Sequence, residues 1–143
     1  FIKKSELTTM RPFSQEFRKV LLGSAISDKS FDKISIITLT TDDVEKEILK
    51  VMELNNEKLT HFFASEKSEF LFKKDKNINK VLLEKEFIPQ KRILIRKLIE
   101  GDYPALEKIF SPNLLNMFPI MAKASADVIN NYESKTGVKV DWI

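Results

Sequence analysis

Glycine occurs at only three of the 143 positions, and this scarcity restricts what the chain can fold into. Gly23, Gly101 and Gly137 lie far apart, so they cannot form the glycine-rich loop that cradles phosphate groups. Each glycine instead follows a stretch with helical periodicity, where a left-handed glycine commonly ends a helix. The glycines therefore predict helix ends and argue against a nucleotide-binding enzyme.

Apolar residues recur at helical spacing along most of the chain. The helices that this spacing predicts span residues 13–22, 42–63, 78–87, 89–100, 102–110 and 113–135. Ser14, Asp42 and Ser111 stand where a side chain can cap the first turn, and Glu45 is placed to complete a reciprocal cap. Pro119 lacks a backbone N–H, so we expect it to kink or split the last helix.

Three short stretches alternate between apolar and polar residues or are rich in β-branched residues, as strands are. They cover residues 33–40, 69–74 and 138–142. The first is the best candidate, with Ile34 and Ile36 on one face and Ile37 and Leu39 on the other. Together with the helices, these stretches predict an α+β fold class, a predominantly helical single domain with a small sheet of about three short strands.

Length and composition indicate one self-sufficient domain. A chain of 143 residues is close to the commonest domain size and can bury a core without a metal or disulfide. The absence of cysteine excludes a disulfide framework, a thiolate zinc site and a cysteine nucleophile. We expect residues 1–143 to form a single domain of a longer chain, because residue 1 is Phe rather than Met.

No stretch approaches the roughly 18 consecutive apolar residues that a membrane span requires. We therefore expect a soluble or peripheral protein without a membrane span. The sequence leaves its compartment open, export included.

Residues suited to catalysis are few. His61 is the only histidine, and on a helix over residues 42–63 it would lie away from the apolar side, exposed to solvent. The acidic group at 42–47 is accounted for by the helix dipole, which favours carboxylates in a first turn. We therefore assign no catalytic residue, no metal site and no cofactor. A carboxylate-based enzyme remains an alternative, and it would need a pocket lined by two or more of Asp42, Asp43, Glu45, His61 and Glu66.

Charge is concentrated in one segment. The chain carries a net charge of +3, whereas residues 67–97 alone hold ten basic residues against four acidic ones. The candidate binding residues in this segment are Lys73, Lys74, Arg92, Arg96 and Lys97. Arg92 stands in the first turn of its predicted helix, where the dipole disfavours a cation, so helix stability does not explain its position. The segment indicates a nucleic-acid or phosphate partner, an acidic protein surface, or a solvated face.

An apolar group surrounds the predicted helix break at Pro119. It contains Met117, Phe118 and Met121. Buried, these side chains would be core at a kink; exposed, they would contact a partner, because flexible methionines re-pack around one.

The leading hypothesis is a non-catalytic interaction or assembly protein that binds a macromolecular partner through its surface. We expect that partner to be a protein or a second copy of the chain. The alternatives are a nucleic-acid- or phosphate-contacting module that uses the basic 67–97 segment, and the carboxylate-based enzyme.

Overall fold

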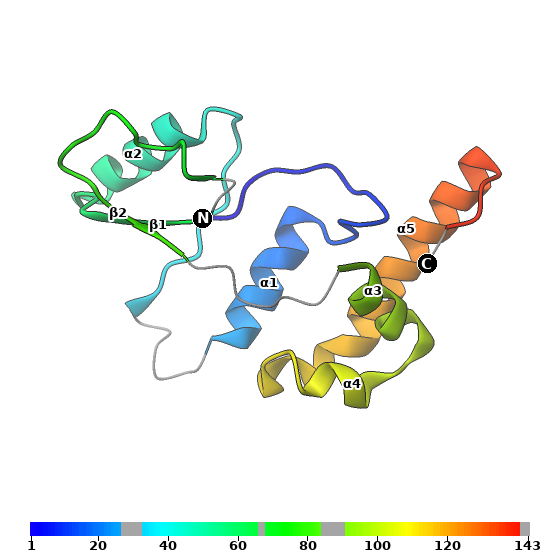
Figure 1. Ribbon diagram of the computed structural model, residues 1–143. Helices are drawn as coiled ribbons and strands as arrows, with labels where there is room; N and C mark the ends of the chain where they lie inside the picture. The colour runs from blue at the N-terminus through cyan, green and yellow to red at the C-terminus, as the bar shows by residue number, and fades with distance from the viewer. Residues whose placement is uncertain (27–32, 66–67, 84–90, 141–143) are drawn as a thin grey trace. The chain divides into compact units, whose positions relative to one another are not determined.

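The computed structural model describes residues 1–26, 33–65, 68–83 and 91–140 (Figure 1). In chain order the elements are α1 (Gln15–Ala25), α2 (Val44–Leu54), β1 (His61–Ala64), β2 (Asn79–Leu82), α3 (Lys91–Glu100), α4 (Tyr103–Glu107), the 3-10 helix η3 (Pro112–Met117) and α5 (Phe118–Thr136). Helices predominate beside a small sheet, so the predicted α+β class is confirmed.

The chain divides into two compact units, each with its own core. The first unit comprises residues 1–38 and 89–143, and the second comprises residues 39–88. That residues 1–143 form a single domain stays a prediction.

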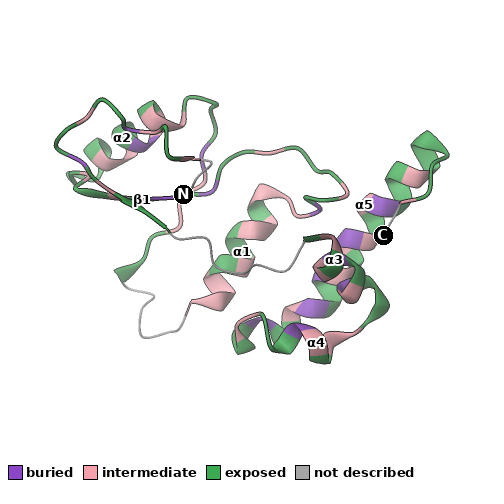
Figure 2. Ribbon diagram, in the orientation of Figure 1, coloured by how far each residue is buried: buried purple, intermediate pink, exposed green. Residues whose placement is uncertain are grey.

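The core of the first unit lies where α3 packs on α5 and α1 packs on η3. Figure 2 shows buried positions along α5. The ring of Phe118 is 1% exposed, with its centroid 5.7 Å from that of Tyr103 and 5.9 Å from that of Phe110. The other buried members of this core are Leu98, Leu106, Leu114 and Met121. From α1, Phe17 and Leu21 lie one turn apart and pack against it.

Most of the predicted helix ends in the first unit are confirmed. The Ser14 hydroxyl accepts a hydrogen bond from the N–H of Phe17, and Gly101 and Gly137 take left-handed φ angles of 75° and 67°. Residues 112–136 are split between Met117 and Phe118, so that Pro119 falls in the first turn of α5, where no N–H is needed. The predicted stop at Gly23 is wrong. Helix α1 continues to Ala25, which packs against the core.

The core of the second unit joins side chains of α2, of the chain before it and of the chain between the strands, with Phe62 of β1 packed against them. Its buried members are Leu39, Ile48, Phe72 and Ile78. The ring centroid of Phe62 lies 5.0 Å from that of Phe72, which takes a φ of 57° in the turn between the strands. Strands β1 and β2 run parallel, with the N–H of Asn79 donating to the carbonyl oxygen of Thr60 at 2.7 Å.

Two predicted helices in this unit are wrong. Helix α2 ends at Leu54 rather than near residue 63, because Asn55 follows as the C-cap and Asn56 adopts a left-handed φ of 53°. The predicted helix 78–87 is strand β2 over Asn79–Leu82, while residues 84–87 lie outside the described residues. The second error has a non-local cause, because residues 79–82 pair with β1 and local periodicity does not register such pairing.

The predicted strand positions are also wrong. Residues 33–40 form only an isolated bridge, Thr38 with Ile2. Residues 69–74 form turns and not a strand. The ring of Phe72 is nevertheless buried in the core, where a turn places it. Residues 138–140 are irregular, and Trp142 lies outside the described residues.

Candidate interaction surface

Strand β1 has one packed side and one exposed side, whereas Val81 and Leu82 of β2 are both exposed, at 38% and 54%. Successive side chains of a strand point to opposite faces, so Phe62 and Ala64 turn toward the core while His61 and Phe63 turn away. In the register of the pair, His61 stands beside Asn79 and Phe63 beside Val81. Phe63 is 63% exposed and Val81 38% exposed. We call His61, Phe63, Asn79 and Val81 the sheet face.

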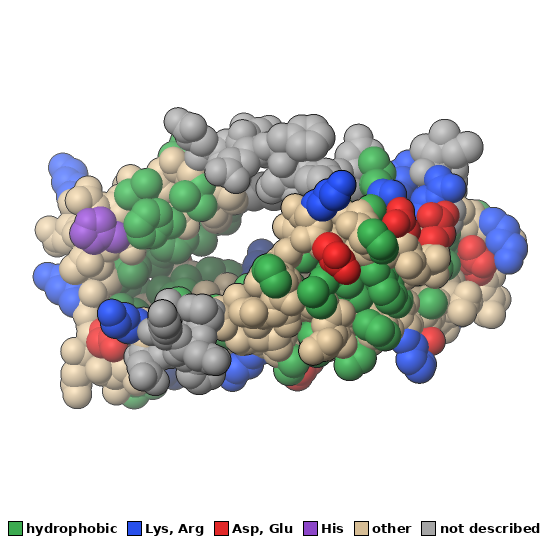
Figure 3. Space-filling model, turned by 90° about the horizontal axis from the view of Figure 1, so that it is seen from below, with side chains coloured by type: hydrophobic (Ala, Val, Ile, Leu, Met, Phe, Trp, Pro, Cys, Tyr) green, Lys and Arg blue, Asp and Glu red, His purple; other side chains and the backbone are tan. Residues whose placement is uncertain are grey.

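An open apolar face is unusual on a parallel sheet, because parallel strands are normally covered on both faces. A two-stranded sheet is also marginally stable by itself. Beyond β2, the N–H of Leu83 continues the ladder to the carbonyl oxygen of Ala64, and the Leu83 side chain is 53% exposed. Figure 3 shows hydrophobic side chains beside the histidine. Grouped exposed apolar side chains of this kind indicate an interaction surface.

His61 lies at the edge of this surface. It is exposed, as predicted, but it belongs to β1 and not to a helix. Its Nδ1 lies 3.0 Å from the hydroxyl oxygen of Thr60, and within the described part of the chain no carboxylate contacts the ring. Among the residues that the structure describes, the imidazole therefore has no orienting acid of the kind that a catalytic histidine uses.

The five candidate basic residues are divided between the two units. Lys73 and Lys74 are exposed in the turn between the strands of the second unit, whereas Arg92, Arg96 and Lys97 belong to α3 of the first unit. On α3, Arg96 Nε lies 2.7 Å from Glu100, and Lys97 Nζ lies 3.0 Å from Asp102. The hydrogen bond from Lys97 lowers the pKa of the Asp102 carboxyl. These two cations are therefore already paired on the exposed surface.

The apolar group at the helix break is internal. Phe118 and Met121 are buried in the core of the first unit, and Met117 packs against it. This burial supports core at a kink, the first of the two interpretations, and gives no support to a partner contact through these three side chains. Two apolar neighbours of this group are exposed, Leu115 at 38% and Ile120 at 53%.

The acidic group at 42–47 is used locally. The Asp43 carboxylate caps α2 by accepting from the N–H of Lys46 at 3.3 Å. Within the described residues, no three acidic or histidine side chains are grouped closely enough to hold a metal ion. Of the residues named for the carboxylate-based enzyme, Glu66 lies outside the described residues, and the other four line neither of the two pockets described below.

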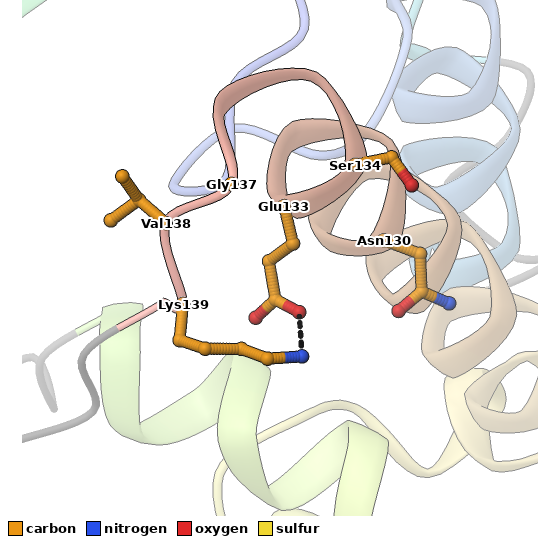
Figure 4. A pocket seen from close by; sticks show the side chains of 6 residues that line it. All are labelled: Asn130, Glu133, Ser134, Gly137, Val138 and Lys139. Carbon is orange, nitrogen blue, oxygen red and sulfur yellow. Dashed lines mark hydrogen bonds and ion pairs between the residues drawn. The ribbon is translucent and has the colours of Figure 1, made fainter.

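One pocket, of about 340 Å³, lies at the end of α5 (Figure 4). Here the chain turns back at Gly137, and the Glu133 carboxylate accepts hydrogen bonds from the Val140 N–H at 3.0 Å and from Lys139 Nζ at 3.1 Å. These bonds, the backbone one first, lower the pKa of Glu133. Since both bonds fasten the returning chain to the helix, we assign this carboxylate a structural role.

Sequence reasoning missed the role of Glu47. The expected reciprocal cap was Glu45, but it is Glu47 that reaches back from α2 to the preceding chain. Its carboxylate accepts the N–H groups and hydroxyls of both Thr40 and Thr41, at 2.7 to 3.1 Å. These bonds, with the Thr40 N–H as the largest contribution, lower its pKa from 4.5 to about 2. The sequence signal for this role is the pair of adjacent threonines before the helix, because each supplies an N–H and a hydroxyl that a carboxylate can accept.

The lowered pKa predicts a specific acid sensitivity. Ionised Glu47 stabilises the folded state fully above pH 4.5, and this contribution is lost as the pH falls from 4.5 toward 2. In Glu47→Gln, an NH₂ group would face one pair of threonine donors, so we expect lower stability at neutral pH and a flatter decline in acid. Urea midpoints measured from pH 2 to 7 test this against Glu45→Gln, whose carboxylate makes none of these bonds. Parallel acid profiles of Glu47→Gln and wild type would contradict it.

Comparisons of the chain with protein-family models, with curated proteins and with solved structures return no match. No helix among the described residues is both long and apolar enough to cross a bilayer. Functional inference therefore depends on the surface of the chain itself.

Proposed function

We propose that the protein is a non-catalytic interaction or assembly protein that binds a protein partner through the sheet face. The supporting observation is the pair formed by Phe63 and Val81, which stand side by side in the register and are 63% and 38% exposed. Covering this face would remove the exposed apolar area of Phe63 and Val81 from water. Aromatic side chains at the centre of an interface commonly carry much of the binding energy.

A phosphate-bearing partner at α3 is a second candidate. It is favoured by the four basic residues on this one helix, Lys91, Arg92, Arg96 and Lys97. Because Arg96 and Lys97 are paired with acidic residues, the helix offers less positive charge than its sequence alone indicates. The apolar side chains of Phe63 and Val81 remain exposed, whereas two of the cations on α3 are already paired. We therefore place the protein partner first.

The proposal is tested by a photo-reactive benzoylphenylalanine at position 63, with position 54 as the matched control. Leu54 is 74% exposed in the same unit but does not belong to the sheet face. We expect a protein adduct in extracts of the native source that forms at position 63 and not at position 54. The adduct partner is then identified by mass spectrometry and purified.

Binding of that purified partner decides the matter. Calorimetry should show Phe63→Ser binding at least about tenfold more weakly than wild type, as truncation of an aromatic anchor does, with Leu54→Ser unchanged. Equal cross-linking at both positions, or unchanged affinity of Phe63→Ser, would refute the proposal.

A further inference from the structure

A groove of about 270 Å³ lies in the second unit, apart from the sheet face. Its lining comes from the end of α2, from the loop that follows it, and from the turn that precedes β2. The residues are Leu49, Met52, Glu53, Glu57, Lys58, Leu59, Asp75, Asn77 and Ile78. None of them belongs to the sheet face.

The groove has an apolar floor. Ile78 is 9% exposed and belongs to the buried core of the unit, while Met52 and Leu59 pack against that core and are partly open. Leu49 stands 41% exposed at the edge. The N–H of Glu57 donates to the carbonyl oxygen of Met52 at 2.9 Å, which holds the loop against the helix end. The core packing and this backbone hydrogen bond therefore hold the floor in place, and its apolar surface can contact an apolar side chain.

The rim is acidic. Glu53 and Glu57 are exposed, and neither forms an ion pair with any residue that the structure describes. Asp75 adds a third carboxylate, which accepts the N–H of Asn77 at 2.9 Å. Lys58 is the one basic residue of the lining, so acidic side chains outnumber basic ones three to one. The second unit as a whole has nine basic against eleven acidic residues, whereas the chain carries +3.

We propose that this groove binds a short peptide segment of a partner in which an apolar anchor is flanked by Lys or Arg. The apolar floor takes the anchor, and the carboxylates of the rim take the flanking cations. The volume lies below the roughly 300–1,000 Å³ of small-molecule sites, which suits one anchoring side chain better than a cofactor. Because the chain carries a net charge of +3, its overall charge does not attract a cationic peptide. The attraction must come from the carboxylates of the rim.

The test uses a fluorescent hexapeptide that alternates arginine and leucine, titrated with the 143-residue chain and followed by anisotropy. We expect saturable binding, at least about tenfold weaker when the peptide carries glutamate for arginine or serine for leucine. The double variant Glu53→Gln, Glu57→Gln should lose affinity to a similar degree. Glu69→Gln is the matched control, since Glu69 is exposed in the same unit but does not line the groove. Leu49→Ser should weaken binding, and Leu54→Ser should not.

Each remaining outcome overturns the proposal. Equal binding of the three peptides would show unspecific adsorption, and equal affinity of the double variant and Glu69→Gln would place the peptide elsewhere. Self-association in sedimentation that the double variant abolishes would assign the groove to a second copy of the chain. Phe63→Ser should keep peptide binding, because Phe63 lies outside the groove, so a failure of this site is distinguishable from a failure of the sheet face.

Discussion

Replacing Phe118 with alanine is expected to destabilise the first unit by about 3–5 kcal/mol, the usual range for truncating a buried phenylalanine. The side chain is 1% exposed and contacts the rings of Tyr103 and Phe110, so its removal costs both apolar burial and ring contacts. Because Phe118 begins α5 directly after η3, the neighbouring segments cannot close the cavity without moving both helices. Chemical denaturation, read as the change in free energy of unfolding, measures this effect.

The matched control for this prediction is Ile120→Ala. Ile120 lies two residues further along the same helix and is 53% exposed, so its truncation should cost well under about 1 kcal/mol. A similar loss in both variants would show that the face of α5 assigned to the core is wrong. Phe118→Leu, which keeps most of the apolar volume, should recover part of the lost stability.

The helix ends were predictable because their causes lie within a few residues of each other. Ser14 bonds to an N–H three residues on, and Gly101 and Gly137 adopt a backbone conformation that other residues resist. The exception at Gly23 follows from a distant cause, since Ala25 packs on a core built mainly from residues beyond 89. Local rules therefore succeed where no remote contact competes with them.

The sequence predicts that a small sheet exists, but it places the strands at the wrong residues. The apolar spacing of α2 continues through Leu59 and Phe62 and therefore predicts a helix where strand β1 lies; both side chains do reach the same core. The signal that breaks the helix is local, namely the two turn-forming asparagines Asn55 and Asn56. The partner of β1, however, lies beyond the turn that contains Phe72, and parallel pairing over that distance leaves no periodicity to detect.

The candidate surfaces differ in how far the sequence could have indicated them. The sheet face depends on knowing which residues stand opposite Phe63, so it could not be predicted without the register. The basic segment was visible, yet the division of its residues between two units is a property of the fold. The pairing of Arg96 with Glu100 could be predicted from their spacing of four residues on a helix. Because of this pairing, the number of basic residues alone overstates the positive charge that α3 offers to a partner.

Replacing Ile48 with alanine is expected to destabilise the second unit by about 2–5 kcal/mol. Ile48 is 2% exposed on α2 and belongs to the core with Leu39, Phe72 and Ile78. Leu54→Ala, on the same helix and 74% exposed, is the control and should change stability by less than about 0.5 kcal/mol. A loss under about 1 kcal/mol for Ile48→Ala would show that the assigned core face of α2 is wrong.

Ile48→Ala and Phe118→Ala together test the prediction of a single domain, because each alters the core of a different unit. If residues 1–143 unfold as one cooperative body, both substitutions shift the same transition, and different probes report coincident midpoints. If the units unfold separately, calorimetry resolves two transitions, and each substitution lowers only its own. The second result would contradict the single-domain prediction, and it would make residues 39–88 the smallest part of the chain in which to seek both the sheet face and the groove.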